Sequence, residues 1–252
     1  MIEISKSELQ AFYQSIQGFS PDNSEQQSMV LDEMANFVAK KIHTSAPDFI
    51  LSLDTELSVI AGELHKPKAS IEISGDDVLL SDDGVKVLEA VLIHVLRNSM
   101  AHGIESEDER NNFGKPKHGV LSFHFAKKEG YLDLTIKDDG RGLNLSKIKN
   151  KAKLGCIEVS SMPDEQIADL ICMEDLSTRD SVSMISGIGI GMSSVRSTLE
   201  TVEGSIGINL EEPMRSREGD SMFPFSFSIR LPSKLWMSST NSGTRSSNSK
   251  CA

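Results

Sequence analysis

The side chains best suited to chemistry lie at regular spacing in segment 92–103, Leu-Ile-His-Val-Leu-Arg-Asn-Ser-Met-Ala-His-Gly. His94, Asn98 and His102 recur every four residues, so on a helix they form one polar stripe about 80° wide. Gly103 is expected to end that helix in a left-handed conformation. The buried face of the same helix is expected to consist of Leu88, Val91, Leu92, Val95 and Leu96.

This stripe allows three chemical interpretations. A zinc site fails on distance, because His94 and His102 are about 12 Å apart along a helix axis and zinc bonds are about 2 Å long. A solvated face with two ordinary histidines remains open. So does a magnesium site, in which the amide oxygen of Asn98 binds the metal between two titratable imidazoles.

Two glycine clusters follow. Asp138-Asp139-Gly140-Arg141-Gly142 begins where an expected strand stops, which suits either a ligand-binding loop or a plain β-turn. Gly187-Ile188-Gly189-Ile190-Gly191 leads directly into a helix that starts at Met192, and amides at such a position suit an anion such as phosphate. The second cluster matches neither a Rossmann fingerprint nor a Walker A loop.

Hydrophobic periodicity predicts the elements that must position these groups. Helical spacing is found at 83–102, 144–154, 164–173 and 192–202, and the first 66 residues also read as helical. Period-two alternation predicts strands at 71–73, 120–126, 131–137, 206–210 and 223–231, the second and third forming a hairpin.

The expected fold is α+β, a two-layer sandwich with a mixed, mainly antiparallel sheet and helices on one face. We divide the chain into an N-terminal helical segment (1–66), a mixed domain (67–235) and a disordered tail (236–252). The apolar stripe of the N-terminal helices is expected to pack on its own domain more readily than to form a dimer.

Composition excludes several classes of protein. The chain has 26 basic and 37 acidic residues and a net charge of −11, which argues against a nucleic-acid binder. No apolar run approaches the ~20 residues of a membrane span, and the N-terminus lacks the features of a secretory signal. Three widely spaced cysteines favour reduced thiols and a cytoplasmic location.

The order of the three polar elements carries a resemblance to a known family. The chain resembles the ATP-binding domain of the GHKL superfamily, and within it the kinase domain of CheA-type chemotaxis histidine kinases. His94 is diagnostic, because most sensor kinases have glutamate four residues before the asparagine. The segments that carry the likeness, over about residues 67–233, are HVLRNSMAHGIE (94–105), EDERNNFGK (107–115), DDGRGL (138–143), Ser177-Thr178, SGIGIGM (186–192) with Val195-Arg196, and FSIRLP (227–232).

The resemblance implies the Bergerat (GHKL) fold, with ATP and Mg²⁺ as ligands. It implies that Asn98 binds Mg²⁺, that His94 occupies the proposed general-base position, and that Asp138 accepts the adenine amino group. The other positions implied to contact ATP or shape its pocket are Arg97 and His102 near the phosphates, Gly140 and Gly142 at the base, Ser177 and Thr178 in the lid, and Gly187, Gly189, Gly191 and Met192 around the phosphates.

The chain departs from the family pattern at several positions, in the asparagine helix and in the lid. The aspartate usual before the second histidine is Ala101, and the arginine usual between the first two lid glycines is Ile188. The two lid phenylalanines are replaced by Cys172 and Leu176. By this resemblance, nucleotide binding is expected to survive these changes. Lid closure, and therefore the rate of phosphoryl transfer, is expected to be affected.

Three functions follow from the resemblance. The first is an ATP-dependent protein-histidine kinase module that phosphorylates a histidine on a separate phosphotransfer protein and so feeds a response regulator. The second is an ATP-binding regulatory module or pseudokinase. The third is a serine/threonine-directed kinase of the anti-sigma-factor type, against which His94 argues. No phosphotransfer domain is found, His43 is taken as a plain surface histidine, and a dimer through the N-terminal helices is possible.

Overall fold

The computed structural model describes residues 4–17, 24–172, 192–215 and 221–238. Its centre is a five-stranded sheet in the order β2-β4-β5-β9-β6, in which β2 and β4 are parallel and the other pairs antiparallel. The strands are β2 (Ser70–Gly75), β4 (Val120–Lys128), β5 (Tyr131–Asp138), β6 (Ser205–Leu210) and β9 (Phe225–Pro232). The predicted strands and the hairpin are thus confirmed.

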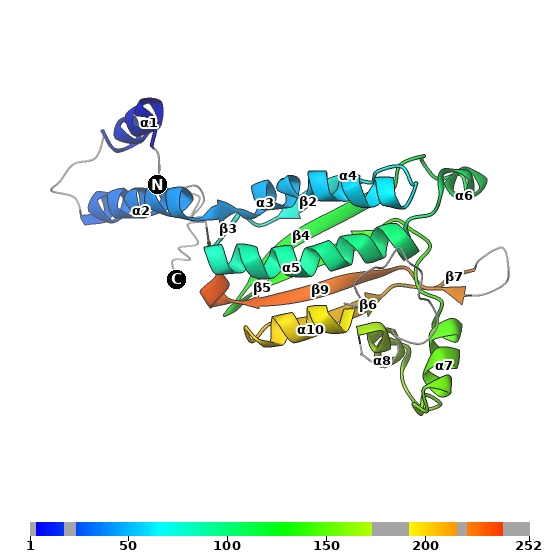
Figure 1. Ribbon diagram of the computed structural model, residues 1–252. Helices are drawn as coiled ribbons and strands as arrows, with labels where there is room; N and C mark the ends of the chain where they lie inside the picture. Colours follow the sequence, from blue (N-terminus) through cyan, green and yellow to red (C-terminus); the bar gives the residue numbers. More distant parts are fainter. Residues whose placement is uncertain (1–3, 18–23, 173–191, 216–220, 239–252) are drawn as a thin grey trace, which may run out of the picture.

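One face of this sheet is buried. Alternate residues of the hairpin, among them Phe123, Phe125 and Leu134, point into the core, whereas His124 and Thr135 between them are at least partly exposed. Period-two alternation of this kind belongs to a sheet with one covered face. Figure 1 shows α5 (Asp82–Asn98) running across the sheet, with α4 (Asp54–Glu63) and α10 (Met192–Glu200) beside it. The predicted two-layer α+β architecture is confirmed.

The remaining helices lie at the two ends of this core. Near the N-terminus are α1 (Lys6–Ile16), α2 (Ser24–Ile42) and α3 (Ala46–Ser52). Beyond the C-terminal end of α5 come the π-helical turn η1 (Ser99–Gly103), α6 (Glu107–Asn112), α7 (Leu145–Leu154), α8 (Asp164–Asp169) and the short 3-10 turn η2 (Leu170–Cys172). Among the helices of the described residues, none combines the length and the hydrophobicity that a membrane span requires.

Residues 4–17 and 24–66 form helices α1 to α4, with the short strand β1 (Thr44–Ser45) between α2 and α3, and they divide into two parts. Helices α3 and α4 contribute Phe49, Ile50, Leu57 and Ile60 to the same buried cluster as α5 and the sheet. Helices α1 and α2 pack on each other and project to one side of the molecule, and α2 also contacts β1 (Figure 1). The rings of Phe12 and Phe37 stack with centroids 4.5 Å apart, while the exposed hydrophobic residues of α2 are Met29, Leu31, Met34, Val38 and Ile42.

The assignment of residues 236–238 to a disordered tail is wrong. They form β10 (Trp236–Ser238), which pairs antiparallel with β3 (Val78–Leu80), and β3 also pairs with β1 (Thr44–Ser45). The turn η3 (Ser233–Leu235) before β10 is fixed as well, because the Leu235 carbonyl accepts from both the amide and the hydroxyl of Ser81. Residues 239–252 lie outside the described part. The short strands β7 (Met214–Arg215) and β8 (Ser221–Met222) form a separate pair.

Candidate functional site

Helix α5 forms one wall of the candidate site. Ser81 caps its N-terminus by accepting from the Gly84 amide, and the predicted apolar face, which includes Leu92 and Leu96, is fully buried. The helix does not run on to His102, because from Ser99 to Gly103 the backbone changes to a π-helical turn. The amide of Ile104 donates to the Ser99 carbonyl five residues back, at 2.7 Å.

This turn corrects two expectations about the polar stripe. His94, Asn98 and His102 do not share one straight stripe, since the π turn changes the helical register between Asn98 and His102. Gly103 does not adopt a left-handed conformation. It is required for a steric reason instead, because a β-carbon at this position would lie 2.7 and 2.8 Å from the two carboxylate oxygens of Asp138.

The amine of Lys66 holds the π turn from the side of α4. It donates to the carbonyl oxygens of Met100 at 2.7 Å, Ala101 at 3.1 Å and Ile104 at 2.7 Å, which uses all three of its N–H groups. Burial is the main cause that lowers the pKa of Lys66, and the nearby Arg141 lowers it further. Lys66 therefore supplies the hydrogen bonds that the carbonyl groups of an interrupted helix require.

Asp138, the last residue of β5, forms the opposite wall. Its carboxylate accepts from the Ser99 hydroxyl and, at 3.0 Å, from the Gly140 amide. Burial raises the pKa of this carboxyl, these two hydrogen bonds oppose the shift, and the neighbouring Asp139 and Glu105 carboxylates add to it. A carboxylate has about four lone-pair positions, so acceptor capacity remains for a ligand N–H group.

Backbone contacts set the shape of the loop after Asp138. Gly142 has a φ of +77°, and a β-carbon there would lie 2.5 Å from the Phe223 carbonyl oxygen. Leu143 and Phe223 then exchange backbone hydrogen bonds of 2.8 and 2.9 Å. The loop is thereby attached to the chain that leads into β9.

These walls enclose a cavity of about 120 Å³. Among the described residues its lining is Asn98, Ser99, His102, Gly103, Asp138, Gly142, Met192, Phe225 and Phe227. A site that buries a whole drug-sized ligand measures about 300–1,000 Å³, so the size of this hollow suits one part of such a ligand, for example a flat ring. Phe225 and Phe227, edge to face with centroids 5.2 Å apart, give it an apolar side.

The electrostatic environment on the His102 side of the cavity is positive. Burial lowers the pKa of His102, and the cations Lys66, Arg141 and Lys151 lower it further. The pKa of His94 is also lowered, by burial and then by Arg97. Both imidazoles are therefore mostly neutral at pH 7. The positive charges of Lys66, Arg141 and Lys151 near His102 therefore favour an anionic ligand on this side of the cavity.

The sequence-predicted site residues are only partly brought together. Asn98, His102, Asp138, Gly142 and Met192 line the cavity. The described lining does not include His94, Arg97 or Gly140. Gly140 acts on the site indirectly, because its amide donates a hydrogen bond to the Asp138 carboxylate. Arg97 donates to Glu63 of α4 at 2.8 Å and so points to that helix. Ser177, Thr178, Gly187, Gly189 and Gly191 lie outside the described residues.

Sequence reasoning missed several residues of this site. Ser99 and Gly103 flank predicted residues on the same segment, so proximity in sequence was a usable signal for both. Phe225 and Phe227 were recognised only as members of an alternating strand. Lys66 carried no local signal, because its partners are 34 to 38 residues away.

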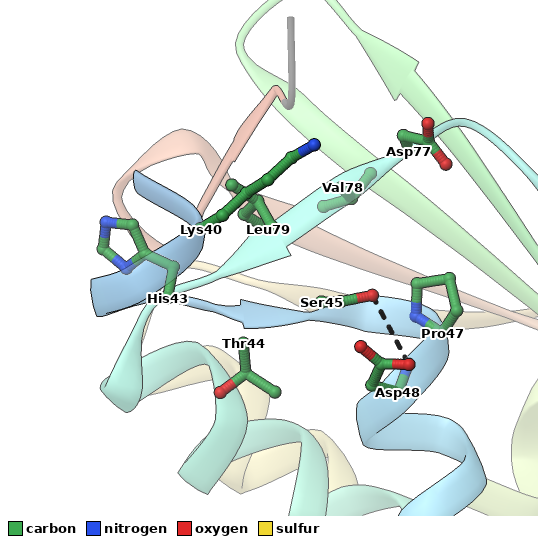
Figure 2. A pocket seen from close by; sticks show the side chains of 9 residues that line it. All are labelled: Lys40, His43, Thr44, Ser45, Pro47, Asp48, Asp77, Val78 and Leu79. Carbon is green, nitrogen blue, oxygen red and sulfur yellow. Dashed lines mark hydrogen bonds between the residues drawn. The ribbon is translucent and has the colours of Figure 1, made fainter. Parts of the chain in front are cut away.

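A second, larger cavity of about 480 Å³ lies near the start of α5 instead of its end. Figure 2 shows its lining, in which Ser45 caps α3 by accepting from the Asp48 amide, while Lys40 extends from α2. His43 is half-buried here, and its Nδ1 atom has no hydrogen-bond partner in the part of the chain that the structure describes. Among the described residues, Lys40 and His43 line this cavity together with Asp48 and Asp77, so its lining mixes basic and acidic side chains and indicates no ligand class. The smaller cavity is therefore the candidate site.

Comparison with known proteins agrees with this geometry. A family model described as "Histidine kinase-, DNA gyrase B-, and HSP90-like ATPase" matches residues 86–235. Chemotaxis protein CheA of Bacillus subtilis is 34% identical over 189 residues, 73% of this chain and 25% of that protein. Sensor histidine kinase CheAY of Helicobacter pylori is 32% identical over 177 residues, 68% of this chain and 21% of that protein.

The gliding motility regulatory protein of Myxococcus xanthus is 33% identical over 148 residues, 57% of this chain and 18% of that protein. The chain thus spans a quarter or less of the length of these three relatives. The family model covers more than half of the chain and includes every described residue of the cavity lining. The chain therefore belongs to the histidine kinase-, DNA gyrase B- and HSP90-like ATPase family.

Proposed function

We propose that this chain is the Mg-ATP-binding catalytic module of a CheA-like protein-histidine kinase. In this role it transfers the γ-phosphoryl group of ATP to a histidine on a separate phosphotransfer protein, which then supplies a response regulator. The observation that carries the proposal is that one cavity is shared by Asn98, Asp138 and Met192, three residues from distant parts of the sequence.

Base recognition is assigned to Asp138. A buried carboxylate with unused acceptor capacity suits the exocyclic amino group of adenine, and a base without that donor leaves the acid unpaired. The apolar side chains of Phe225, Phe227 and Met192 suit the faces and edge of a planar ring. Adenine fits the small size of the hollow, with the phosphates directed toward the positive side that includes His102.

Asn98 is assigned to the metal. Its side chain lies on the cavity, and within the described residues no hydrogen bond engages its amide oxygen, which is the ligand type that Mg²⁺ accepts. Bound Mg²⁺ would neutralise charge on the phosphates, which phosphoryl transfer requires along with positioning. The residues present therefore fit the ion.

His94 is assigned to proton transfer from the phosphoacceptor. A general base must be unprotonated, and burial together with Arg97 lowers the pKa of His94 below its ordinary value. His94 does not belong to the described lining of the cavity, so this role requires the acceptor side chain to approach α5 from outside it.

A regulatory module that binds ATP without efficient transfer is the second candidate. The observation that favours it is Ala101, a methyl group beside His102 where the family usually has an acid. One experiment separates the candidates: incubation of the chain with labelled ATP, Mg²⁺ and isolated phosphotransfer domains. Acid-labile, base-stable phosphate on a domain supports the kinase. Binding without transfer supports the regulatory module, and acid-stable phosphate supports a serine/threonine kinase.

A dimer through α2 is part of the proposal. The hydrophobic side chains of Leu31, Met34, Val38 and Ile42 recur at helical spacing and are 45–66% exposed, as is expected of a helix that packs against a second copy. Sedimentation equilibrium tests it. A monomer at micromolar concentration, or a dimer unchanged by Leu31→Glu with Val38→Glu, contradicts this assignment.

A further inference from the structure

Behind the candidate adenine site lies a buried charge network centred on Arg110. Its side chain has no exposed surface, and all five N–H groups of the guanidinium are engaged. Nη1 and Nη2 bind the two carboxylate oxygens of Asp139 at 3.1 and 2.7 Å, and Nη1 also binds Glu105 at 3.1 Å. Nε and Nη2 donate to the carbonyl oxygens of Pro116 and His118. This network fixes the side chain of Asp139, the neighbour of Asp138.

Lys115 fixes the backbone of the same loop. Its amine donates to Glu105 at 2.7 Å, to the Asp139 carbonyl at 2.8 Å and to the Gly140 carbonyl at 2.9 Å. All three N–H groups are used, so the amine is not available to contact a ligand. Glu105 is only 2% exposed, and it shares its two oxygens between Lys115 and Arg110.

The connection to base recognition runs through one peptide group. The Asp139 carbonyl that Lys115 binds and the Gly140 amide belong to the same planar unit and point in opposite directions. That Gly140 amide is the one that donates to the Asp138 carboxylate at 3.0 Å. A hydrogen bond on one side of the plane therefore determines where the N–H group on the other side points.

We propose that Lys115 is a positioning residue for base recognition. It holds the Asp139–Gly140 peptide so that the Gly140 amide occupies one acceptor site of Asp138 and leaves another directed at the amino group of the base. This inference rests on the proposed function, because it requires adenine to bind at Asp138. It assigns a role in nucleotide selectivity to a residue beyond the C-terminal end of α6, behind the cavity.

The test compares ADP with IDP, which carries a carbonyl oxygen in place of the adenine amino group. In Lys115→Met the side chain keeps a similar length and loses its three N–H donors. Because only the folded protein binds either ligand, the ratio of the two dissociation constants is independent of the folded fraction, and destabilisation alone does not change it. The matched control is Lys117→Met in the same loop, where the side chain is 54% exposed and its amine pairs with Glu107.

Calorimetric titration of the whole chain gives the outcome. The wild-type chain and Lys117→Met should prefer ADP by about tenfold or more, the range of a hydrogen bond to a charged group. Lys115→Met should lose most of that preference, mainly through weaker ADP binding. An unchanged ratio in Lys115→Met overturns the inference and leaves the proposed function standing. No preference in the wild-type chain overturns both.

A second variant covers the case in which Lys115→Met does not fold. Lys115→Gln retains an amide that can donate to one carbonyl. Its ratio of the IDP and ADP dissociation constants should therefore lie between the wild-type ratio and a ratio of about one, which means no preference. Hydrogen exchange of the Gly140 amide in the ligand-free protein provides an independent readout. Exchange should be faster in the Lys115 variant than in wild type, and equal exchange rates contradict the proposal.

Discussion

Gly140 packs directly against the backbone of Gly103. A β-carbon added to Gly140 would lie 2.3 Å from both the carbonyl carbon and the carbonyl oxygen of Gly103. In the same place the Arg141 amide donates to the Gly103 carbonyl at 3.0 Å. The end of α5 and the loop after β5 are thus joined backbone to backbone, and the carboxylate of Asp138 lies between them.

Gly140→Ala tests this contact. The added methyl group must displace a backbone carbonyl, so we expect a loss of stability of about 1–3 kcal/mol together with weaker nucleotide binding. Chemical denaturation and calorimetry measure the two effects. Gly62→Ala on α4 is the control, since among the described residues no atom outside the neighbouring backbone of α4 itself lies within 4 Å of the added carbon, and the expected change is neutral to stabilising. Equal effects of the two substitutions would contradict the close packing.

Asp138→Asn tests base recognition. The amide replaces an acceptor oxygen with a donor, so the affinity for ADP should fall by about tenfold or more. Binding of inorganic tripolyphosphate, which lacks the base, should be unchanged. Asp133→Asn is the control, because Asp133 lies on the same strand and pairs with Arg230 at 3.3 Å. Unchanged ADP affinity in Asp138→Asn would show that the base binds elsewhere.

Asn98→Ala tests the metal assignment. Loss of the amide oxygen should remove the part of ATP affinity that depends on Mg²⁺ and should abolish turnover. The measurement is ATP titration with Mg²⁺ and again with a chelator. The variant should bind ATP equally under both conditions, at the affinity of the wild-type chain with chelator. Retention of the full magnesium dependence would exclude Asn98 as a ligand.

Lys66→Met tests the origin of the π-helical turn. Three backbone carbonyls lose their partner, so the free energy of unfolding should fall by about 1–3 kcal/mol or more, and nucleotide affinity should fall with it. Lys68→Met is the control, because Lys68 makes an exposed ion pair with Asp54 that contributes about 0–1 kcal/mol. If both variants are as stable as wild type, Lys66 does not hold the turn.

Stability should decline as the pH falls below about 6.5. In the folded protein the pKa values of His94 and His102 are both lowered from 6.5, so just below that pH the unfolded chain binds more protons than the folded one. Their neutral forms therefore favour folding at neutral pH, and this contribution is lost as the pH drops through the window beneath 6.5. Urea unfolding at about pH 5.5 and 7 measures it.

The double variant His94→Gln, His102→Gln serves as the comparison for that pH series. With both imidazoles removed, the decline between these two pH values should be smaller than in wild type. The pKa values of Glu109 and Glu203 are lowered, so these two carboxyl groups titrate below this range. Burial raises the pKa of Asp138, and this shift acts in the opposite direction to that of the histidines, because it favours the folded protein at lower pH. A wild-type chain whose stability is flat across the window would contradict the lowered pKa values.

Local pattern was sufficient for the regular elements. The alternation in β4, β5 and β9 and the helical spacing in α5 each follow from which face meets the core, and that information repeats every few residues. The capping box of Ser5 and Glu8 is another local feature, and it is present in α1. The fold class and the order of the site motifs could therefore be predicted from the sequence.

Tertiary contacts decided how those motifs meet. The π turn depends on the amine of Lys66, the direction of Arg97 depends on Glu63, and β10 depends on its pairing with β3. The loop at Asp138 is likewise set by Arg110 and Lys115. Each partner lies far away in sequence, and its effect depends on distances of about 3 Å that periodicity does not encode. The sequence by itself determined which elements form and which side chains can do chemistry. Only the folded structure decided which of these side chains share a cavity, because close packing and hydrogen-bond geometry arise between segments that are distant in sequence.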